Sequence, residues 1–414
     1  MVTQRRPAAV EPRGLVVPLT AATFGTYLAL LPAVTITLAL RVEQLDPDGA
    51  ARSLSLVLGV GATVALVSQN VAGMLSDRTR SRFGKRRPWL VAGAALGALC
   101  LWQLSATSSV TGLVAGWAGA QLAYNLTLAG LNPLLAEQFP VASRGRAAGL
   151  LGLAAPTAML AGACLVTLAL PDLRLALVVP AAVCLATVGW LGWVLPDRRL
   201  GPEPLPPLRW RDAAAAFWAS PRRHPDFAWA WLSRLLVFVG TAALLGYRVY
   251  FLQDELGVPA ERIGDVVFTA LLLSTAATVA CAPLFGGLSD RLGARRHLVA
   301  GSAALLAATH LAFALVDGLT AYYVISVVAG VATGCYVAVD LALVADVLPD
   351  TGTAGKDMGV FHLANVLPQM LVPAVAPAVL ALGNGGEAYR ALFLLASAVG
   401  LLGALAILPV RAVR

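Results

Sequence analysis

The chain has 414 residues, of which 58% are hydrophobic and 13% are charged. About a quarter of the residues in a soluble domain are charged, so this composition excludes a large water-soluble domain. Apolar runs of 18 or more residues, each long enough to cross a hydrocarbon core about 30 Å thick, recur from one end of the chain to the other. The net charge of +8 lies mainly between these runs. This distribution favours a role in membrane orientation over nucleic-acid binding.

Twelve membrane-spanning helices are predicted from the apolar runs. They cover residues 15–40, 54–75, 89–107, 110–135, 146–170 and 174–195, and then 228–252, 265–288, 298–316, 320–345, 358–382 and 389–409. The first run follows Arg5, Arg6 and Arg13 but is too long for the apolar part of a secretory signal, so a retained helix is expected. The predicted fold class is therefore an all-α membrane protein.

An internal repeat divides these helices into two groups of six. GMLSDR at residues 73–78 recurs as GGLSDR at residues 286–291, and RRPWLVAG from Arg86 is echoed by RRHLVAG from Arg295. Further along, EQFP at residues 137–140 is matched by DVLP at residues 346–349 at nearly the same spacing. We therefore predict an N-terminal half over residues 1–195, a cytoplasmic linker over 196–227 and a C-terminal half over 228–414.

Basic residues are distributed unevenly about the predicted helices. One set of loops and both termini hold most of the 30 Lys and Arg residues, whereas the opposite loops hold only a few arginines: Arg41, Arg52, Arg174, Arg262 and Arg390. By the positive-inside rule, both termini are predicted to be cytoplasmic. The arginine- and alanine-rich composition is typical of a bacterial protein, so the expected location is the cell (inner) membrane of a bacterium.

Two parallel six-helix repeats are typical of carriers in which a midplane site opens alternately to either side. Such a carrier needs a cytoplasmic contact that can form and break, and a carboxylate can supply it by pairing with an arginine or with a helix N-terminus. The predicted cytoplasmic gate comprises Gly73, Asp77, Arg78, Arg86, Glu137, Arg146, Gly286, Asp290, Arg291, Asp346 and Lys356. Gly73 and Gly286 are expected to admit a neighbouring backbone. The alternative is that these charges only fix topology.

At GMLSDR and the loop that follows it, the chain resembles the major facilitator superfamily, whose signature between helices 2 and 3 is Gly-x-x-x-Asp-Arg-x-Gly-Arg-Arg. The resemblance covers nearly the whole chain and implies the major facilitator fold and secondary transport. SDRTRSRFGKRRPWL at residues 76–90 is similar to the loop of the glycoside-pentoside-hexuronide:cation symporters and of sucrose transporters. This likeness implies symport of a sugar or glycoside. Those symporters place acidic cation ligands within helix 2, but residues 54–75 contain none, so sodium coupling is not expected.

Polar side chains recur inside the predicted helices, where such groups are costly and therefore candidates for function. On helical spacing, the predicted substrate-binding residues are Tyr27, Gln121, Asn125, Arg248, Tyr336, Asn365 and Gln369. For the amides, the alternative is that they hydrogen-bond neighbouring helices together. For Arg248, the alternative is that its side chain extends outward to the membrane surface.

Three further residues, Arg234, Asp340 and His362, are predicted to couple transport to protons. Asp340 lies six residues before Asp346, about 9 Å inside the cytoplasmic end of its helix, and Arg234 lies at about the same depth. A carboxylate buried alone tends to take up a proton, whereas a nearby arginine keeps it ionised. A motion that separates Asp340 from Arg234 would therefore load and release a proton, with His362 as a relay. The alternative is a permanent structural ion pair.

The leading hypothesis is thus a proton-linked or passive carrier of a small polar solute. The alternatives are an exporter of amphiphilic drugs or metabolites and a non-transporting membrane sensor or scaffold. No nucleophile with a base, no metal-ligand set and no phosphate-binding loop is evident, so neither an enzyme nor a metal or cofactor is expected. The expected partners are a small-molecule substrate, the lipid bilayer and protons, with no nucleic acid, and the chain is expected to function as a monomer.

Overall fold

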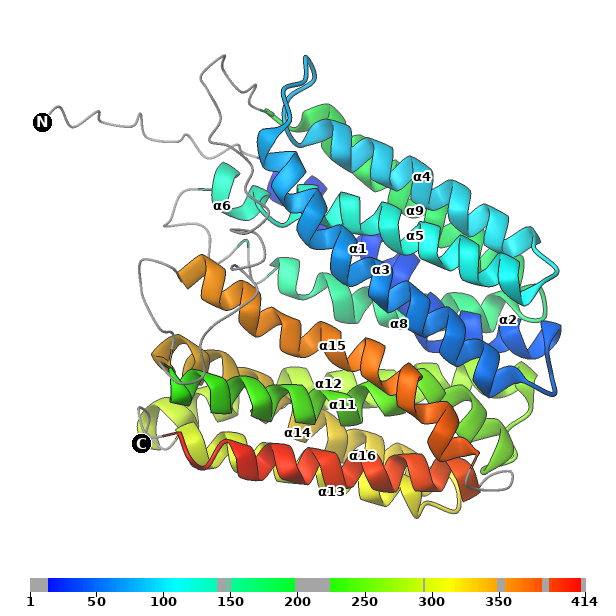
Figure 1. The fold of residues 1–414 in the computed structure, drawn as a ribbon, viewed down its shortest axis with the longest axis vertical. Helices are drawn as coiled ribbons and strands as arrows, with labels where there is room; N and C mark the ends of the chain where they lie inside the picture. Colours follow the sequence, from blue (N-terminus) through cyan, green and yellow to red (C-terminus); the bar gives the residue numbers. More distant parts are fainter. Residues whose placement is uncertain are drawn as a thin grey trace, which may run out of the picture. The chain divides into compact units, whose positions relative to one another are not determined.

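The computed structural model describes residues 14–139, 147, 150–197, 224–292, 295–347, 354–381 and 387–410. The regular elements within these residues are all helices (Figure 1). The chain separates into two compact units. The first comprises Met1–Pro47 and Val60–Leu205, and the second comprises Asp48–Gly59 and Pro206–Arg414. The predicted half boundaries at residues 195 and 228 stay predictions, because most of the linker lies outside the described residues.

The first unit is built from α1 Val16–Pro32, the π-helical turn Ala33–Thr37, α2 Leu38–Leu45, α4 Arg87–Ala106, α5 Val110–Leu131, the short α6 Leu134–Gln138, α8 Ala154–Ala169 and α9 Leu173–Val194. To these it adds the greater part of α3, Ala50–Arg78, whose first ten residues group with the second unit. Helix α4 packs against α5 and α9, and α1 packs against α8 and α9 (Figure 1). The helices α1 and α2 form one continuous span with the π-turn between them.

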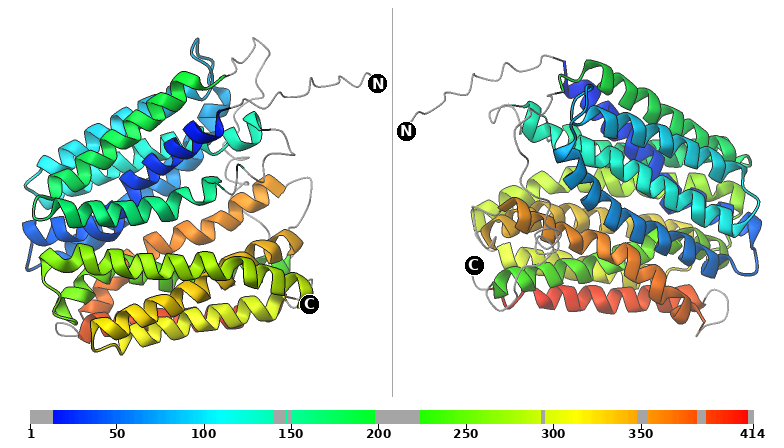
Figure 2. Two further views of the ribbon diagram at one scale, coloured as in Figure 1. Left: turned by 180° about the vertical axis from the view of Figure 1, so that it is seen from behind. Right: turned by 45° about the horizontal axis from the view of Figure 1, so that its top comes forward.

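The second unit is built from α11 Pro225–Asp254, α12 Ala260–Leu292, α13 Arg295–Ala314, α14 Leu319–Val347, α15 Ala354–Leu380 and α16 Glu387–Ala406. Helix α12 packs on α14, α16 packs on both α11 and α13, and α15 packs on α11 (Figure 2). Its core consists of side chains from α11, α13, α14, the end of α16 and the residues that follow α16, among them Val237, Val299, Val339 and Ile407.

All twelve predicted helices are present in the described residues, but their ends differ from the prediction. Helix α12, for example, runs from 260 to 292 rather than from 265 to 288, because a helix continues past its lipid-facing part into polar residues. Helix α5 instead ends at Leu131, four residues earlier than predicted, because Pro133 lacks the N–H that would continue it. Eleven spans are long and apolar enough to cross a membrane. Helix α5, which carries Gln121 and Asn125, has 22 residues but is not among these eleven spans.

The first span was predicted as one regular helix ending at residue 40, and the structure differs in two respects. A π-helical turn follows Pro32, because a proline ring inside a helix clashes with the carbonyl one turn earlier and the wider turn relieves this clash. The helix then continues to Leu45. Its polar end is held by Arg41, which donates through Nη2 to the carbonyl oxygens of Ser105 (3.3 Å) and Thr107 (2.8 Å).

Candidate functional site

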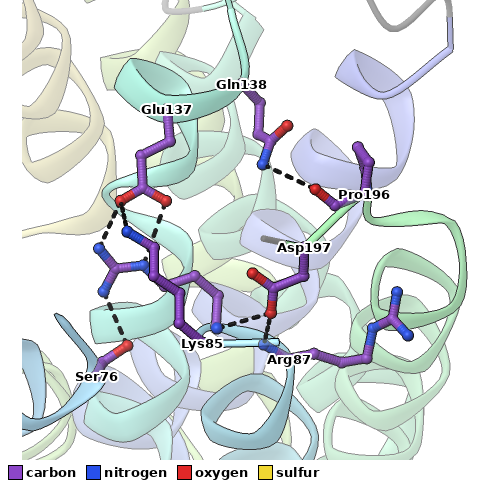
Figure 3. Close-up of polar contacts among 8 residues, drawn as sticks. Ser76, Lys85, Arg87, Glu137, Gln138, Pro196 and Asp197 are labelled. Atoms are coloured by element: carbon purple, nitrogen blue, oxygen red, sulfur yellow. Dashed lines mark hydrogen bonds and ion pairs between the residues drawn. The ribbon is translucent and has the colours of Figure 1, made fainter. Parts of the chain in front are cut away.

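A buried arginine organises the loop between α3 and α4. Arg86 is only 2% exposed. Its guanidinium donates from Nη1 to Oγ of Ser76 (2.8 Å) and from Nη2 and Nε to the carboxylate of Glu137 (2.7 and 3.4 Å). Lys85 donates from Nζ to the same carboxylate at 2.7 Å. Figure 3 shows Glu137 on α6 facing Lys85. The end of α3 and α6 thus meet at the Arg86 guanidinium of the loop between α3 and α4.

A second carboxylate, Asp197, holds the start of α4. Its Oδ2 accepts hydrogen bonds from the backbone N–H groups of Arg86 (2.7 Å) and Arg87 (2.8 Å), where α4 begins (Figure 3). Gly84 has φ +102, and a Cβ at this position would collide with the Asp197 carboxylate, so a side chain here is excluded on both counts. We call Ser76, Lys85, Arg86, Glu137 and Asp197 the α3–α4 loop cluster.

The electrostatics of this cluster favour a charged Glu137. Burial raises the pKa of Glu137, but hydrogen bonds and charge attraction from Arg86 and Lys85 outweigh burial, so the pKa lies below its ordinary value of 4.5. Glu137 therefore stays ionised near neutral pH. An ionised carboxylate shared by two cations is a contact that fixes the relative positions of the elements carrying them.

The structure brings together two of the eleven predicted gate residues, Arg86 and Glu137. The prediction missed Ser76, Lys85 and Asp197. The SDR and GKRR motifs contain the first two, but nothing in the local pattern links Asp197 to this loop. A Cβ at Gly73 would meet no atom within 4 Å among the described residues, so the expected close approach of a neighbouring backbone stays a prediction. Arg291 is exposed on the last turn of α12.

Most of the remaining predicted gate residues lie outside the described part of the chain. Arg78 is half-buried at the end of α3. The side chains of Asp77, Asp290, Asp346 and Lys356, the surroundings of Gly286 and the whole of Arg146 lie outside what the structure describes.

The second unit contains a polar cluster that joins three helices. Arg234 on α11 forms an ion pair from Nη1 to Oδ2 of Asp340 on α14, and it donates from Nε to Oδ1 of Asn365 on α15 at 2.6 Å. The arginine is also 5.2 Å from the centre of the Phe238 ring. That ring meets Tyr336 edge to face at 6.3 Å. We call Arg234, Phe238, Tyr336, Asp340 and Asn365 the α11–α14–α15 cluster.

The ion pair in this cluster is largely buried, whereas Phe238 and Asn365 are half-buried. Asp340 is 2% exposed and the Arg234 side chain 11%. Tyr336 lies one helical turn before Asp340, and its buried hydroxyl has no well-aligned hydrogen bond. A buried ion pair is costly to form and more costly to break, because removing one partner leaves an uncompensated charge. The pair is therefore either a permanent link between helices or a group that changes state with the protein.

The other predicted interior residues have mixed surroundings. On α5, Asn125 donates from Nδ2 to the backbone oxygen of Gln121 (2.7 Å) and to its Oε1 (3.2 Å), and both side chains are buried. Tyr27 on α1 is half-buried, and Gln369 on α15 is exposed. The side chain of the predicted relay His362 lies outside the described residues.

Arg248 on α11 is 6% exposed, so its predicted alternative, a side chain extended to the surface, is wrong for this structure. Tyr247 beside it is buried too, and its hydroxyl is 2.6 Å from Oγ of Ser55. Arg248 is therefore an interior cation.

Long apolar helices with buried ion pairs define a multi-pass membrane protein of the carrier type. The model of the Major Facilitator Superfamily matches residues 14–277 and again residues 249–414. The chain belongs to the major facilitator superfamily. It is thus a secondary transporter, with a small-molecule substrate and a membrane location, and not an enzyme.

Solved structures support the same fold. A crystal structure of a mutant of the nucleoside transporter NupG has a TM-score of 0.73 and 16% identity, and the match covers 96% of this chain and 99% of that one. A bacterial homolog of the human lysosomal transporter Spinster, in an inward-facing and unoccupied conformation, has a TM-score of 0.69 and 16% identity, with 96% and 98% covered. At this identity the likeness concerns the fold alone. The comparison with curated protein sequences gives no match.

Proposed function

We propose that this transporter moves a small polar solute, with a sugar or glycoside as the favoured class, and that Asp340 couples its movement to protons. The observation that carries the proposal is the buried ion pair of Asp340 and Arg234. Several carboxylate–arginine pairs lie in the described residues of the second unit, and in this one both side chains are inside the helix bundle. The preference for a sugar rests on the resemblance of the loop at residues 76–90.

The geometry around the ion pair supports a change of state. Asp340 depends on Arg234 for its charge, because a lone carboxylate at this depth would be protonated. The arginine is shared with Asn365 on α15, so a shift of α15 relative to α14 would draw Arg234 away from Asp340. Loss of the arginine would favour protonation of Asp340, and its return would expel the proton. Alternating access supplies such helix movements.

We also propose a cytoplasmic gate and an orientation in the membrane. The α3–α4 loop cluster stabilises the cytoplasmic end of the first unit, and the repeated GGLSDR motif is its counterpart in the second. We place both termini in the cytoplasm and the protein in the inner membrane of a bacterium. The charge distribution between the loops supports this orientation.

The test measures transport by the Asp340→Asn variant reconstituted in liposomes. Thermal-shift screening of the purified protein against sugars and amphiphilic drugs first identifies a solute, whose uptake driven by a pH gradient is then compared with gradient-free exchange. A coupling site predicts that concentrative uptake fails while exchange survives. Asp317→Asn is the matched control, because Asp317 is an exposed carboxylate in the same unit. Its uptake should stay close to wild type.

Two other results would count against proton coupling at Asp340. Normal concentrative uptake by Asp340→Asn would remove the residue from coupling. Loss of both uptake and exchange, restored when Arg234 is also neutralised, would make the ion pair structural.

One observation favours the second candidate function, export of amphiphilic compounds. An apolar groove of about 370 Å³ lies between α1 and α8 of the first unit, and Val17, Phe24, Leu150 and Leu153 are among the residues that line it. An acyl chain or an aromatic drug would fit such a lining. If Phe24→Ala reduced stabilisation by amphiphilic drugs in the screen and left sugars without effect, the exporter would replace the sugar carrier.

A further inference from the structure

The outer part of α11 contains a buried cation that has no counterion in the part of the chain that the structure describes. Arg248 lies within a run of seven consecutive buried residues, Gly246–Leu252. It is 6% exposed, and its Nε has no hydrogen-bond partner. Among the described residues, no carboxylate forms an ion pair with it. A guanidinium in these surroundings has lost its water and gained little in return.

Arg234 on the same helix is an internal control for this observation. The two arginines are 14 residues apart, which is nearly four turns, so they project from similar faces of α11 about 21 Å apart along its axis. Arg234 has Asp340 as its partner on α14. The two arginines therefore differ mainly in what α14 offers them.

The register between α11 and α14 identifies what faces Arg248. Arg234 near the start of α11 meets Asp340 near the end of α14, and Arg248 near the end of α11 interacts electrostatically with the buried hydroxyl of Tyr322 near the start of α14. The two helices therefore run antiparallel. Moving 14 residues back from Asp340 along α14 reaches Ser326, which is buried and bonds only to the Tyr322 carbonyl (2.8 Å). Hydroxyl groups thus occupy the level where the inner arginine has a carboxylate.

We propose that Arg248 is the anchor for a negatively charged group of the transported solute, so that the substrate is a small organic carboxylate, such as a sugar acid, rather than a neutral sugar. The inference rests on the proposed function, because it assumes that a solute reaches the interior of the second unit. Guanidinium binds a carboxylate through two parallel hydrogen bonds, and no carboxylate among the described residues pairs with Arg248. The hydroxyls of Tyr322 and Ser326 would complete the site around the bound group.

The first test compares D-glucuronate with D-glucose, which differ by a carboxylate in place of a hydroxymethyl group, and benzoate with benzyl alcohol. Each is added to the purified full-length chain in lipid-free detergent, so that no phospholipid headgroup competes. At least one carboxylate should raise Tm more than its neutral counterpart, and Arg248→Gln should abolish this difference. Arg262→Gln, an exposed arginine on the first turn of α12, should keep it. Equal effects of both members of each pair, or a difference that survives Arg248→Gln, would overturn the proposal.

The second test needs no ligand. Ser326→Asp supplies a carboxylate opposite Arg248, so Tm should rise in the absence of any added anion, and the stabilisation by carboxylates should be lost. Ser302→Asp on α13 is the matched control, because Ser302 is about as buried as Ser326 but is not the residue that the register places opposite Arg248. The Tm of this variant should fall. If Ser326→Asp is destabilised as much as Ser302→Asp, Arg248 lacks the open anion site. Neither test uses a pH gradient, so failure here is distinct from failure of coupling at Asp340.

Discussion

Two of the buried arginines, Arg86 and Arg234, differ in how their charge is balanced. Arg86 meets a carboxylate that is also shared by Lys85 and lies near the surface, and it bonds to Ser76 as well. Arg234 meets Asp340 inside the helix bundle, where no second cation is present among the described partners. Loss of one partner is therefore expected to cost more in the α11–α14–α15 cluster than in the α3–α4 loop cluster.

The first prediction concerns Arg234→Gln. This change leaves the buried Asp340 without its counterion, so the free energy of unfolding should fall by about 3–5 kcal/mol. Thermal denaturation in detergent measures the loss as a lower Tm. The double variant Arg234→Gln with Asp340→Asn removes both charges and should recover most of it. A double variant no more stable than Arg234→Gln alone would show that the charge imbalance is not the cause.

The second prediction concerns the pH dependence of Glu137. Because its pKa lies below the ordinary 4.5 in the folded protein, its contribution to stability is fully present above that pH and is lost as the pH falls below it. The difference in Tm between wild type and Glu137→Gln should thus be constant from pH 7 to pH 5 and should shrink in more acidic buffer. Glu261→Gln, an exposed residue on α12, serves as the control. A difference that grows on acidification would contradict the prediction.

At the scale of the element, α4 depends on a residue that is distant in sequence. Asp197, 111 residues after Arg86, accepts the N–H groups of Arg86 and Arg87. Pro88 follows within the first turn, where its missing N–H is no loss. Farther along, α4 lies so close to α5 that a Cβ at Gly93 would be 2.6 Å from the carbonyl oxygen of Ala123. Helix α4 is thus fixed by a carboxylate at its start and a close backbone contact near its middle.

The third prediction concerns this carboxylate. Asp197→Ala removes the acceptor for two backbone donors and should lower the free energy of unfolding by about 1 kcal/mol, as other lost helix caps do. Asp197→Asn keeps an oxygen acceptor and should lose less. Hydrogen exchange at residues 86–87 should increase in the alanine variant.

The matched control is Asp172→Ala, which removes the cap of a different helix. Asp172 accepts the N–H of Arg174 at the start of α9, so this variant should increase exchange at Arg174 and leave residues 86–87 protected. Equal exchange at residues 86–87 in both variants would show that Asp197 does not cap α4.

The sequence predicted the helices well because their signal is local. A run of about 20 apolar residues indicates a span wherever it occurs, and each of the twelve was found at its place. The ends, the π-turn after Pro32 and the short helix α6 were not predicted, because they depend on backbone geometry and on packing. In the candidate site, the depth of Arg234 and Asp340 within their helices predicted that they would meet. The link from Asp197 to Arg86 could not be predicted, since the two residues share no motif.

At the scale of the whole molecule, the internal repeat places related loops at corresponding positions in the two halves. The α3–α4 loop cluster shows what the first copy of the motif does in structural terms. It binds Arg86 to Ser76 within the motif and to Glu137 on α6. The chain contains many basic residues near this loop, among them Arg80, Arg82 and Arg87, and these decide on which side of the membrane it is expected to lie.

The last prediction tests this orientation. Arg82 is exposed in the α3–α4 loop, and Asp48 is exposed before α3, at the opposite end of the same helix. Helix α3 has 29 residues, about 43 Å at 1.5 Å per residue, so these two sites lie on opposite sides of a bilayer whose hydrocarbon core is about 30 Å thick. The positive-inside rule places Arg82 in the cytoplasm and Asp48 outside. We therefore expect that, in intact cells expressing variants without the five native cysteines, a membrane-impermeant maleimide labels Asp48→Cys but not Arg82→Cys. Permeabilised cells should show labelling of both, which controls for reactivity, and labelling of Arg82→Cys alone in intact cells would reverse the assigned orientation and place the α3–α4 loop cluster on the outer face.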